Sequence, residues 1–100
     1  MTFFRLGLAI GLLAATQAHA SSPDAWADLR RRSDSACLAQ ARDLRQARVV
    51  AYSPDFRDHT VSSVQGAYRH GAMRGQQARL TCLFDKRTAR AEIGELSPRR

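Results

Sequence analysis

The pattern of apolar and polar residues changes its period near residue 48. Before that point, apolar residues recur at the spacing of an α-helix, and after it they recur at the two-residue spacing of strands. Ser22-Pro23-Asp24 is typical of a helix start, with an N-capping hydroxyl, a proline at the first helical position and an acid in the first turn. The sequence therefore predicts a helix from this start to about Ala47.

One side of the predicted helix carries the residues expected to meet a core: Trp26, Leu29, Ser33, Cys37, Gln40, Ala41 and Leu44. The run Ser33-Asp34-Ser35 weakens the middle, because these side chains compete for backbone hydrogen bonds. It indicates either a kink or a second helix start capped by Ser33.

Four strands are predicted to follow, over residues 49–52, 60–69, 77–84 and 89–93. The third strand has the clearest alternation, with one face carrying Ala78, Leu80, Cys82 and Phe84. In the second strand Val61 and Val64 are out of phase, which predicts a bulge near Ser63 or Gly66. The two glycines in residues 70–75 suit a hairpin connection, and residues 85–88 are predicted to turn into the last strand.

Together these elements predict an α+β fold, with one N-terminal helix packed on a three- to four-stranded antiparallel β-meander. We expect a single domain over residues 21–96 and a frayed tail over residues 97–100. The fourth strand is expected to bury Ala89, Ala91 and Ile93. The expected core residues are Trp26, Leu29, Leu44, Tyr52, Val64, Tyr68, Leu80, Phe84 and Ile93.

Residues 1–20 have the pattern of a cleaved signal peptide. Arg5 precedes an apolar run from Leu6 to Ala15, and Ala18-His19-Ala20 has the small-x-small form that signal peptidase recognises. An apolar run of about ten residues is too short to span a bilayer roughly 30 Å thick. We therefore expect a mature chain that begins at Ser21 and is exported to the periplasm or secreted.

The chain has two cysteines, Cys37 and Cys82, so one intramolecular pairing is available. The alternatives are a redox pair, which usually has Cys-x-x-Cys spacing, and half of a zinc site, which needs further ligands. Neither pattern is present, and an oxidising compartment preserves disulfides. The sequence predicts a Cys37–Cys82 disulfide that joins the helix to the third strand, with a stabilising effect of about 4 kcal/mol.

This layout resembles a group of small exported bacterial proteins of unknown function. The residues that carry the resemblance are Cys37 in the helix, the Gly66-Ala67-Tyr68 strand, and the 78–85 strand Ala-Arg-Leu-Thr-Cys-Leu-Phe-Asp. It implies the same helix-plus-meander fold and implies no activity.

Arginine dominates the charge of the chain. The chain has sixteen basic and nine acidic residues, for a net charge of +7, and all the basic residues except Lys86 are arginines. On the predicted helix, Arg30, Arg31, Arg42, Arg45 and Arg48 project on the side away from Cys37, with Leu38 among them. This face is either a solvated surface or a site for an anionic polymer or membrane surface.

Candidate catalytic residues are few. Asp58-His59, with Asp55 nearby, is the best candidate for a base and its orienting carboxylate, and His70 lies at the other end of the second predicted strand. The sequence has no phosphate-binding loop, no nucleophile motif and no metal-ligand cluster, so we expect no metal and no cofactor. Tyr52 and Tyr68 suit core positions better than stacking platforms for bases.

These features favour a small exported, non-enzymatic interaction module, such as an accessory subunit, an inhibitor or an envelope factor. Its expected partner is another envelope or extracellular protein. The alternative is binding of an anionic polymer or membrane surface through the arginine-rich face.

Overall fold

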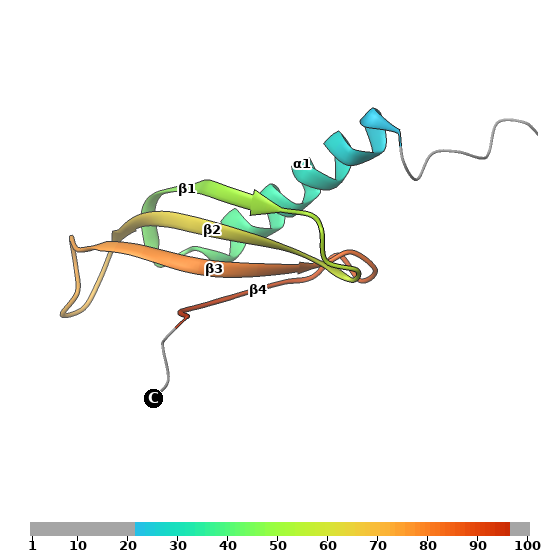
Figure 1. Ribbon diagram of the computed structural model, residues 1–100. Coiled ribbons are helices and arrows are strands. Elements are labelled where there is room, and N and C mark those ends of the chain that lie inside the picture. Colours follow the sequence, from blue (N-terminus) through green and yellow to red (C-terminus); the bar gives the residue numbers. More distant parts are fainter. Residues whose placement is uncertain (1–21, 97–100) are drawn as a thin grey trace, which may run out of the picture.

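The computed structural model describes residues 22–96 and contains one helix packed on a four-stranded antiparallel sheet (Figure 1). The strands follow in chain order across the sheet, β1-β2-β3-β4, so the sheet is a simple meander. The elements are α1 (Pro23–Gln40), β1 (Leu44–Ser53), β2 (His59–Tyr68), β3 (Gln77–Asp85) and β4 (Ala91–Gly94). The predicted α+β fold is confirmed, whereas the predicted signal peptide and C-terminal tail lie outside these residues.

Helix α1 begins as the sequence predicts. The backbone N–H of Ala25 donates to the Ser22 side-chain oxygen at 3.1 Å, Pro23 takes the first helical position, and Asp24 lies in the first turn. The Ser22 side chain thus gives this N–H a second acceptor beside the Ser22 carbonyl, and Asp24 places a negative charge at the positive end of the helix dipole. Ser33 causes no second start, because the helix is continuous through it.

The predicted C-terminal end of the helix, at residue 47, is wrong. The helix ends at Gln40, where Ala41 leaves helical geometry and its N–H donates to the Leu38 carbonyl. Residues 42 and 43 turn the chain, and Leu44 starts β1 with its side chain 2% exposed. Residues 42–47 have high helix propensity apart from Asp43, but burial of Leu44 in the sheet and the pairing of β1, which includes Val49 and Val50, with β2 outweigh it.

The predicted bulge is also on a different strand. Strands β2 and β3 pair in unbroken register from His59 opposite Asp85 to Ala67 opposite Gln77. The irregularities lie in β1, between Arg45 and Arg48 and between Val49 and Ala51. Bulges in an edge strand disturb its outer hydrogen-bonding row and discourage pairing with other chains.

Gly66 on β2 faces the first of these irregularities. A Cβ added at Gly66 would lie 2.9 Å from the Arg45 carbonyl oxygen and 3.0 Å from the Leu44 Cβ. The glycine thus allows the backbone of β1 to pass close over β2 at the point where β1 bulges.

One face of the sheet meets α1, and β2 shows the alternation clearly. Thr60, Ser62, Val64 and Gly66 are buried on this face. The buried apolar residues are Leu29, Cys37, Ala41, Leu44, Val64, Ala78, Cys82 and Phe84, with Tyr68, Leu80, Ala91 and Ile93 partly buried against them. Tyr52 is half-buried.

Trp26 is a core prediction that the structure contradicts, because its side chain is 46% exposed. The first turns of α1 reach beyond the sheet, so the face that carries Trp26 has no strand beneath it there (Figure 1). Ala89, expected inside the fourth strand, is exposed and has a positive φ of 64° in the turn before β4.

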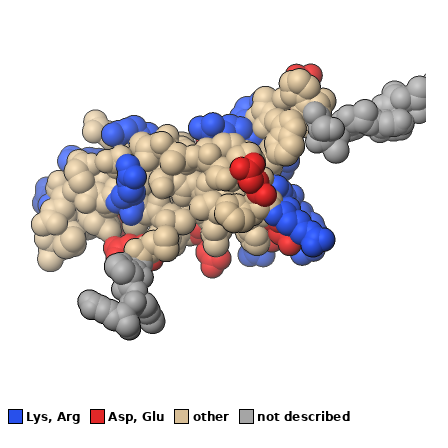
Figure 2. All heavy atoms as spheres, in the orientation of Figure 1, with Lys and Arg blue, Asp and Glu red and all other residues tan. Residues whose placement is uncertain are grey.

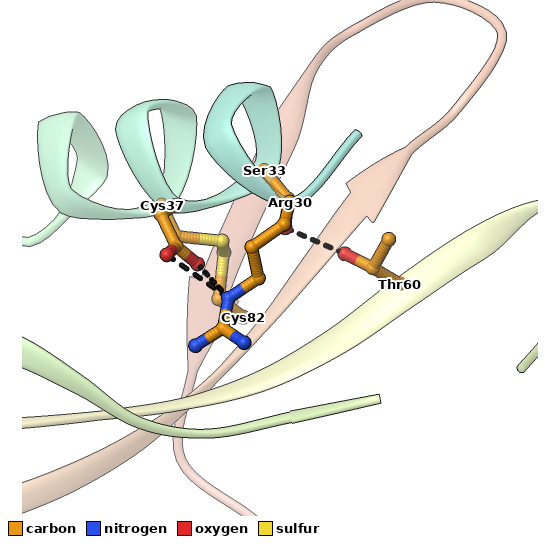
Figure 3. The surroundings of a disulfide bond; sticks show 6 residues. Arg30, Ser33, Cys37, Thr60 and Cys82 are labelled. Atoms are coloured by element: carbon orange, nitrogen blue, oxygen red, sulfur yellow. Dashed lines mark hydrogen bonds and ion pairs between the residues drawn. A yellow bond between two sulfur atoms is a disulfide. The ribbon is translucent and has the colours of Figure 1, made fainter. Parts of the chain in front are cut away.

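A disulfide joins α1 to the middle of the sheet. Cys37 on α1 and Cys82 on β3 are bonded and fully buried, which confirms the pairing predicted from the sequence (Figure 3). One turn earlier on the helix, the Ser33 hydroxyl lies 2.7 Å from the Thr60 hydroxyl of β2. The helix is therefore attached to two strands by one covalent bond and one buried hydrogen bond.

Candidate binding surface

The arginines at the middle of α1 are paired with acids of the same helix. Arg30 contacts Asp34 at 3.1 Å, and Asp28 accepts bonds from Arg31 at 2.7 Å and from Arg32 at 3.0 Å. Arg30 also lies over the Tyr52 ring, 4.3 Å from its centroid. These contacts offset much of the positive charge on the helix.

The five arginines predicted to share one helix face do not do so. Arg30 and Arg31 lie on α1, whereas Arg42 is in the turn after it and Arg45 and Arg48 are on β1. The helix ends before these three residues, for the reason given above. The structure therefore separates the predicted set into a paired helical part and a second part on and next to the sheet.

Three further arginines, from β3 and from the β2–β3 connection, lie near Arg42, Arg45 and Arg48. On the sheet face away from α1, Arg48 lies opposite Gln65, which lies opposite Arg79 on β3. Arg45 lies one row further along, opposite Ala67. The hairpin between β2 and β3 adds Arg69 and Arg74.

Two hydrogen bonds hold the α1–β1 turn against the hairpin. The Arg69 backbone N–H donates to the Asp43 carbonyl at 2.9 Å, and the Arg69 side chain donates to the Leu44 carbonyl at 3.2 Å. These bonds bring the two connections to the same end of the molecule. We call this end, with its six exposed arginines, the basic end: Arg42, Arg45, Arg48, Arg69, Arg74 and Arg79.

The net positive charge of residues 22–96 is concentrated at the basic end. It holds six of the thirteen basic residues and, in Asp43, one of the nine acidic residues. The other seven basic and eight acidic residues nearly cancel. Figure 2 shows blue side chains over the end where β1 begins and β2 joins β3, whereas the blue group at the opposite end lies beside red side chains. Like charges held together in this way create a local positive potential that attracts anions.

No arginine of the basic end forms an ion pair within the part of the chain that the structure describes. Glu95 is engaged elsewhere, since its carboxylate accepts a bond from the Tyr68 hydroxyl at 3.3 Å. Tyr68 lies on the sheet face covered by α1. Desolvation is the main cause of the raised pKa of its hydroxyl, and the negative charge of Glu95 is the second cause. Arg45, Arg48 and Arg79 lie on the opposite face.

In the described part of the chain, no hydrogen bond or ion pair joins His59 or His70 to the Asp58 carboxylate. His59 faces Asp85 instead, with its Nε2 3.9 Å from a carboxylate oxygen, and the Asp58 carbonyl accepts a bond from the Lys86 backbone. Asp85 accepts bonds from the backbone N–H groups of Thr88 and Arg87, and these hold the pKa of its carboxyl below the usual value. The Asp85 carboxylate therefore shapes the β3–β4 turn.

A shallow hollow of about 330 Å³ lies beside His59, lined by Leu83, Asp85, Thr88, Arg90, Ala91 and Glu92. His70 is in the hairpin at the other end of β2. Within residues 22–96, no group of three or more His, Cys, Asp or Glu side chains is arranged to hold a metal ion.

Comparison with known proteins gives no family to which the chain can be assigned: no family model, no curated protein and no solved structure matches it. No helix within residues 22–96 has the length and apolar character needed to cross a membrane.

Sequence reasoning missed Arg69, Arg74 and Arg79 as members of the charged surface. Arg79 was recognisable on the polar side of its strand, and Arg69 and Arg74 flank the hairpin glycines. Their proximity to Arg45 depends on strand register, which no local pattern contains.

Proposed function

We propose that the protein is a small exported, non-enzymatic interaction module that binds an anionic partner through the basic end. The observation that carries this proposal is the separation of charge, with six arginines and one aspartate at one end and a nearly neutral remainder. Arginine suits such a role, because its planar guanidinium donates two parallel bonds to phosphate, sulfate or carboxylate groups.

Export is part of the proposal and has two supports. The first twenty residues have the pattern of a signal peptide, and Cys37 and Cys82 form a buried disulfide of the kind that persists in oxidising compartments. The disulfide stabilises a domain with few buried apolar side chains, which suits a small exported protein.

The test is affinity for a model polyanion. The oxidised protein is applied to immobilised heparin and eluted with a salt gradient, since binding through several cations weakens steeply with ionic strength. The variant Arg45→Glu/Arg79→Glu changes the basic end, and Arg57→Glu/Arg87→Glu makes the same change of net charge in the exposed connections at the other end of the strands.

We expect the basic-end variant to elute at much lower salt than the parent, and the control variant to elute close to the parent. Equal shifts in both variants would mean that heparin responds only to net charge, and the proposal would be wrong.

A second candidate is a protein partner that covers the sheet face away from α1. That face carries Val61 opposite Leu83, and Leu83 is 38% exposed. An interface of this kind would be insensitive to salt, in contrast to the basic end. A partner retained from an envelope extract at high salt, and lost on Leu83→Glu, would favour this candidate.

A further inference from the structure

We propose that the anionic partner is the surface of a membrane that contains acidic lipids, and that the tip of the β2–β3 hairpin enters this surface. The inference rests on the proposed function and adds the partner's chemistry. It comes from one apolar side chain, Met73, at the tip of the hairpin that lies within the basic end.

The hairpin projects past the end of the sheet, on the side remote from the first turns of α1 (Figure 1). Backbone bonds order the tip: Arg74 N–H donates to the Gly71 carbonyl, Gln76 N–H to Met73, and Gly75 N–H to Tyr68. Gly71 and Gly75 have φ of 77° and 83°, a conformation that glycine adopts readily. Met73 is thus presented on a hydrogen-bonded loop.

Met73 is 48% exposed, and Arg74 is its neighbour in the chain. Arg69 lies at the base of the same hairpin, and Arg42 and Arg45 lie on the adjoining turn and strand. An exposed apolar tip with cations beside and behind it is an arrangement that interfacial membrane binding uses, because the apolar group enters the acyl boundary while the cations meet lipid phosphates. Arginine stems can also lie along the apolar boundary with their charged groups in the headgroup layer.

Other occupants fit this end less well. A soluble polyanion gains nothing from an exposed methionine, so it accounts for the arginines alone. A second copy of the chain is repelled, because six arginines would meet six arginines with one aspartate on each side. A membrane surface accounts for both the charge and the apolar tip.

The expected contributions of these side chains predict weak, reversible binding to the membrane. Each arginine close to an acidic membrane raises the partition coefficient of the protein between water and membrane by about fivefold. Burial of the exposed part of a methionine contributes about a further tenfold. Met73 and the four arginines Arg42, Arg45, Arg69 and Arg74 together give weak peripheral attachment, which is measurable by sedimentation with vesicles.

The experiment compares the oxidised protein on three supports: phosphatidylcholine vesicles, the same vesicles with one-third phosphatidylglycerol, and immobilised heparin. We expect binding to the acidic vesicles and little binding to the neutral ones.

Met73→Ser should weaken binding to acidic vesicles about tenfold and leave elution from heparin unchanged. Met73→Leu should preserve vesicle binding. Phe56→Ser, which removes an apolar side chain 56% exposed in the β1–β2 connection, is the matched control and should have no effect.

Insertion of the tip is read directly from fluorescence. Trp26 is the single tryptophan of the chain, so Met73→Trp in a Trp26→Phe background places one reporter at the tip. Its emission should shift to the blue with acidic vesicles and not with heparin.

The outcomes separate the two proposals. If Met73→Ser leaves vesicle binding unchanged while Arg45→Glu/Arg79→Glu abolishes binding to vesicles and heparin, the membrane inference is wrong and the proposed function stands. If the protein binds heparin and not acidic vesicles, the partner is a soluble polyanion and the inference is again wrong. If the arginine reversal affects neither support, or if the parent binds neither, both proposals fail.

Discussion

The hydroxyls of Ser33 on α1 and Thr60 on β2 lie 2.7 Å apart, and both residues are fully buried where the helix crosses the sheet. A serine in the middle of a helix is otherwise a source of weakness, because it competes for backbone hydrogen bonds. In this position it satisfies a threonine hydroxyl that has no access to water. The pair fixes the position of α1 on β2 beside the disulfide (Figure 3).

Ser33→Ala should reduce the free energy of unfolding by about 1–3 kcal/mol, because it leaves the Thr60 hydroxyl buried without a partner. Thr60→Val should cost less, since a helical serine can bond instead to a carbonyl of its own helix. The double variant should be more stable than the sum of the single losses predicts. Urea denaturation of the three variants measures this coupling, and Ser35→Ala on the exposed side of α1 is the control. Additive losses would show that the two hydroxyls do not stabilise each other.

Removal of the disulfide should be the most damaging change to the core. Cys37 and Cys82 enclose a sequence separation of 45 residues, so the chain-entropy model gives a loss of about 4 kcal/mol for Cys37→Ala/Cys82→Ala. In a domain of this size each kcal/mol moves the melting temperature by about 4–8 °C. Thermal denaturation followed by circular dichroism should therefore show a melting temperature more than about 10 °C below that of the parent. Equal melting temperatures for the parent and the variant would contradict this prediction.

Gly66→Ala should destabilise the sheet by about 1–3 kcal/mol. Its Cβ would meet the Arg45 carbonyl oxygen at 2.9 Å, and relief of that contact requires the bulged β1 to move away from β2. Gly94→Ala on β4 is a matched control, because a Cβ at that position meets nothing within 4 Å. Chemical denaturation should separate the two variants. A Gly66→Ala protein as stable as the Gly94→Ala protein would mean that β1 does not pass this close to β2.

Asp85 should make the stability of the domain depend on acid pH. Its pKa is lowered in the folded state by the Thr88 and Arg87 N–H groups, whereas an unperturbed aspartate has a value of 3.8. A group of this kind stabilises the fold above its unfolded pKa, and the effect is lost as pH falls through the lower folded pKa. Asp85→Asn keeps an oxygen acceptor for the two N–H groups and removes the charge.

The Asp85→Asn variant should therefore be less stable than the parent at neutral pH, and the two should converge in strong acid. Urea denaturation between neutral and strongly acidic pH measures the difference. Asp55→Asn, in the exposed connection between β1 and β2, controls for the loss of one negative charge. A difference that stays constant as the pH falls would exclude the linkage.

The sequence by itself determined the element types and the pairing of the cysteines. Ser22-Pro23-Asp24 located the helix start, the alternation from Gln77 to Phe84 located β3, and two cysteines left a single pairing. These features are local or follow from counting, so they need no knowledge of what packs against what. The antiparallel meander followed because short connections join neighbouring strands.

Only the tertiary structure decided where α1 ends and which arginines lie together. Residues 41–47 contain good helix formers and no β-branched residue, so local propensity favours a helix, and burial of Leu44 together with pairing to β2 selects the strand from Leu44 onward. That choice moves Arg45 and Arg48 from a helix face to the open face of the sheet, across Gln65 from Arg79. Strand register and the contacts between two turns are long-range properties, and they brought together a charged end that no window of the sequence contains.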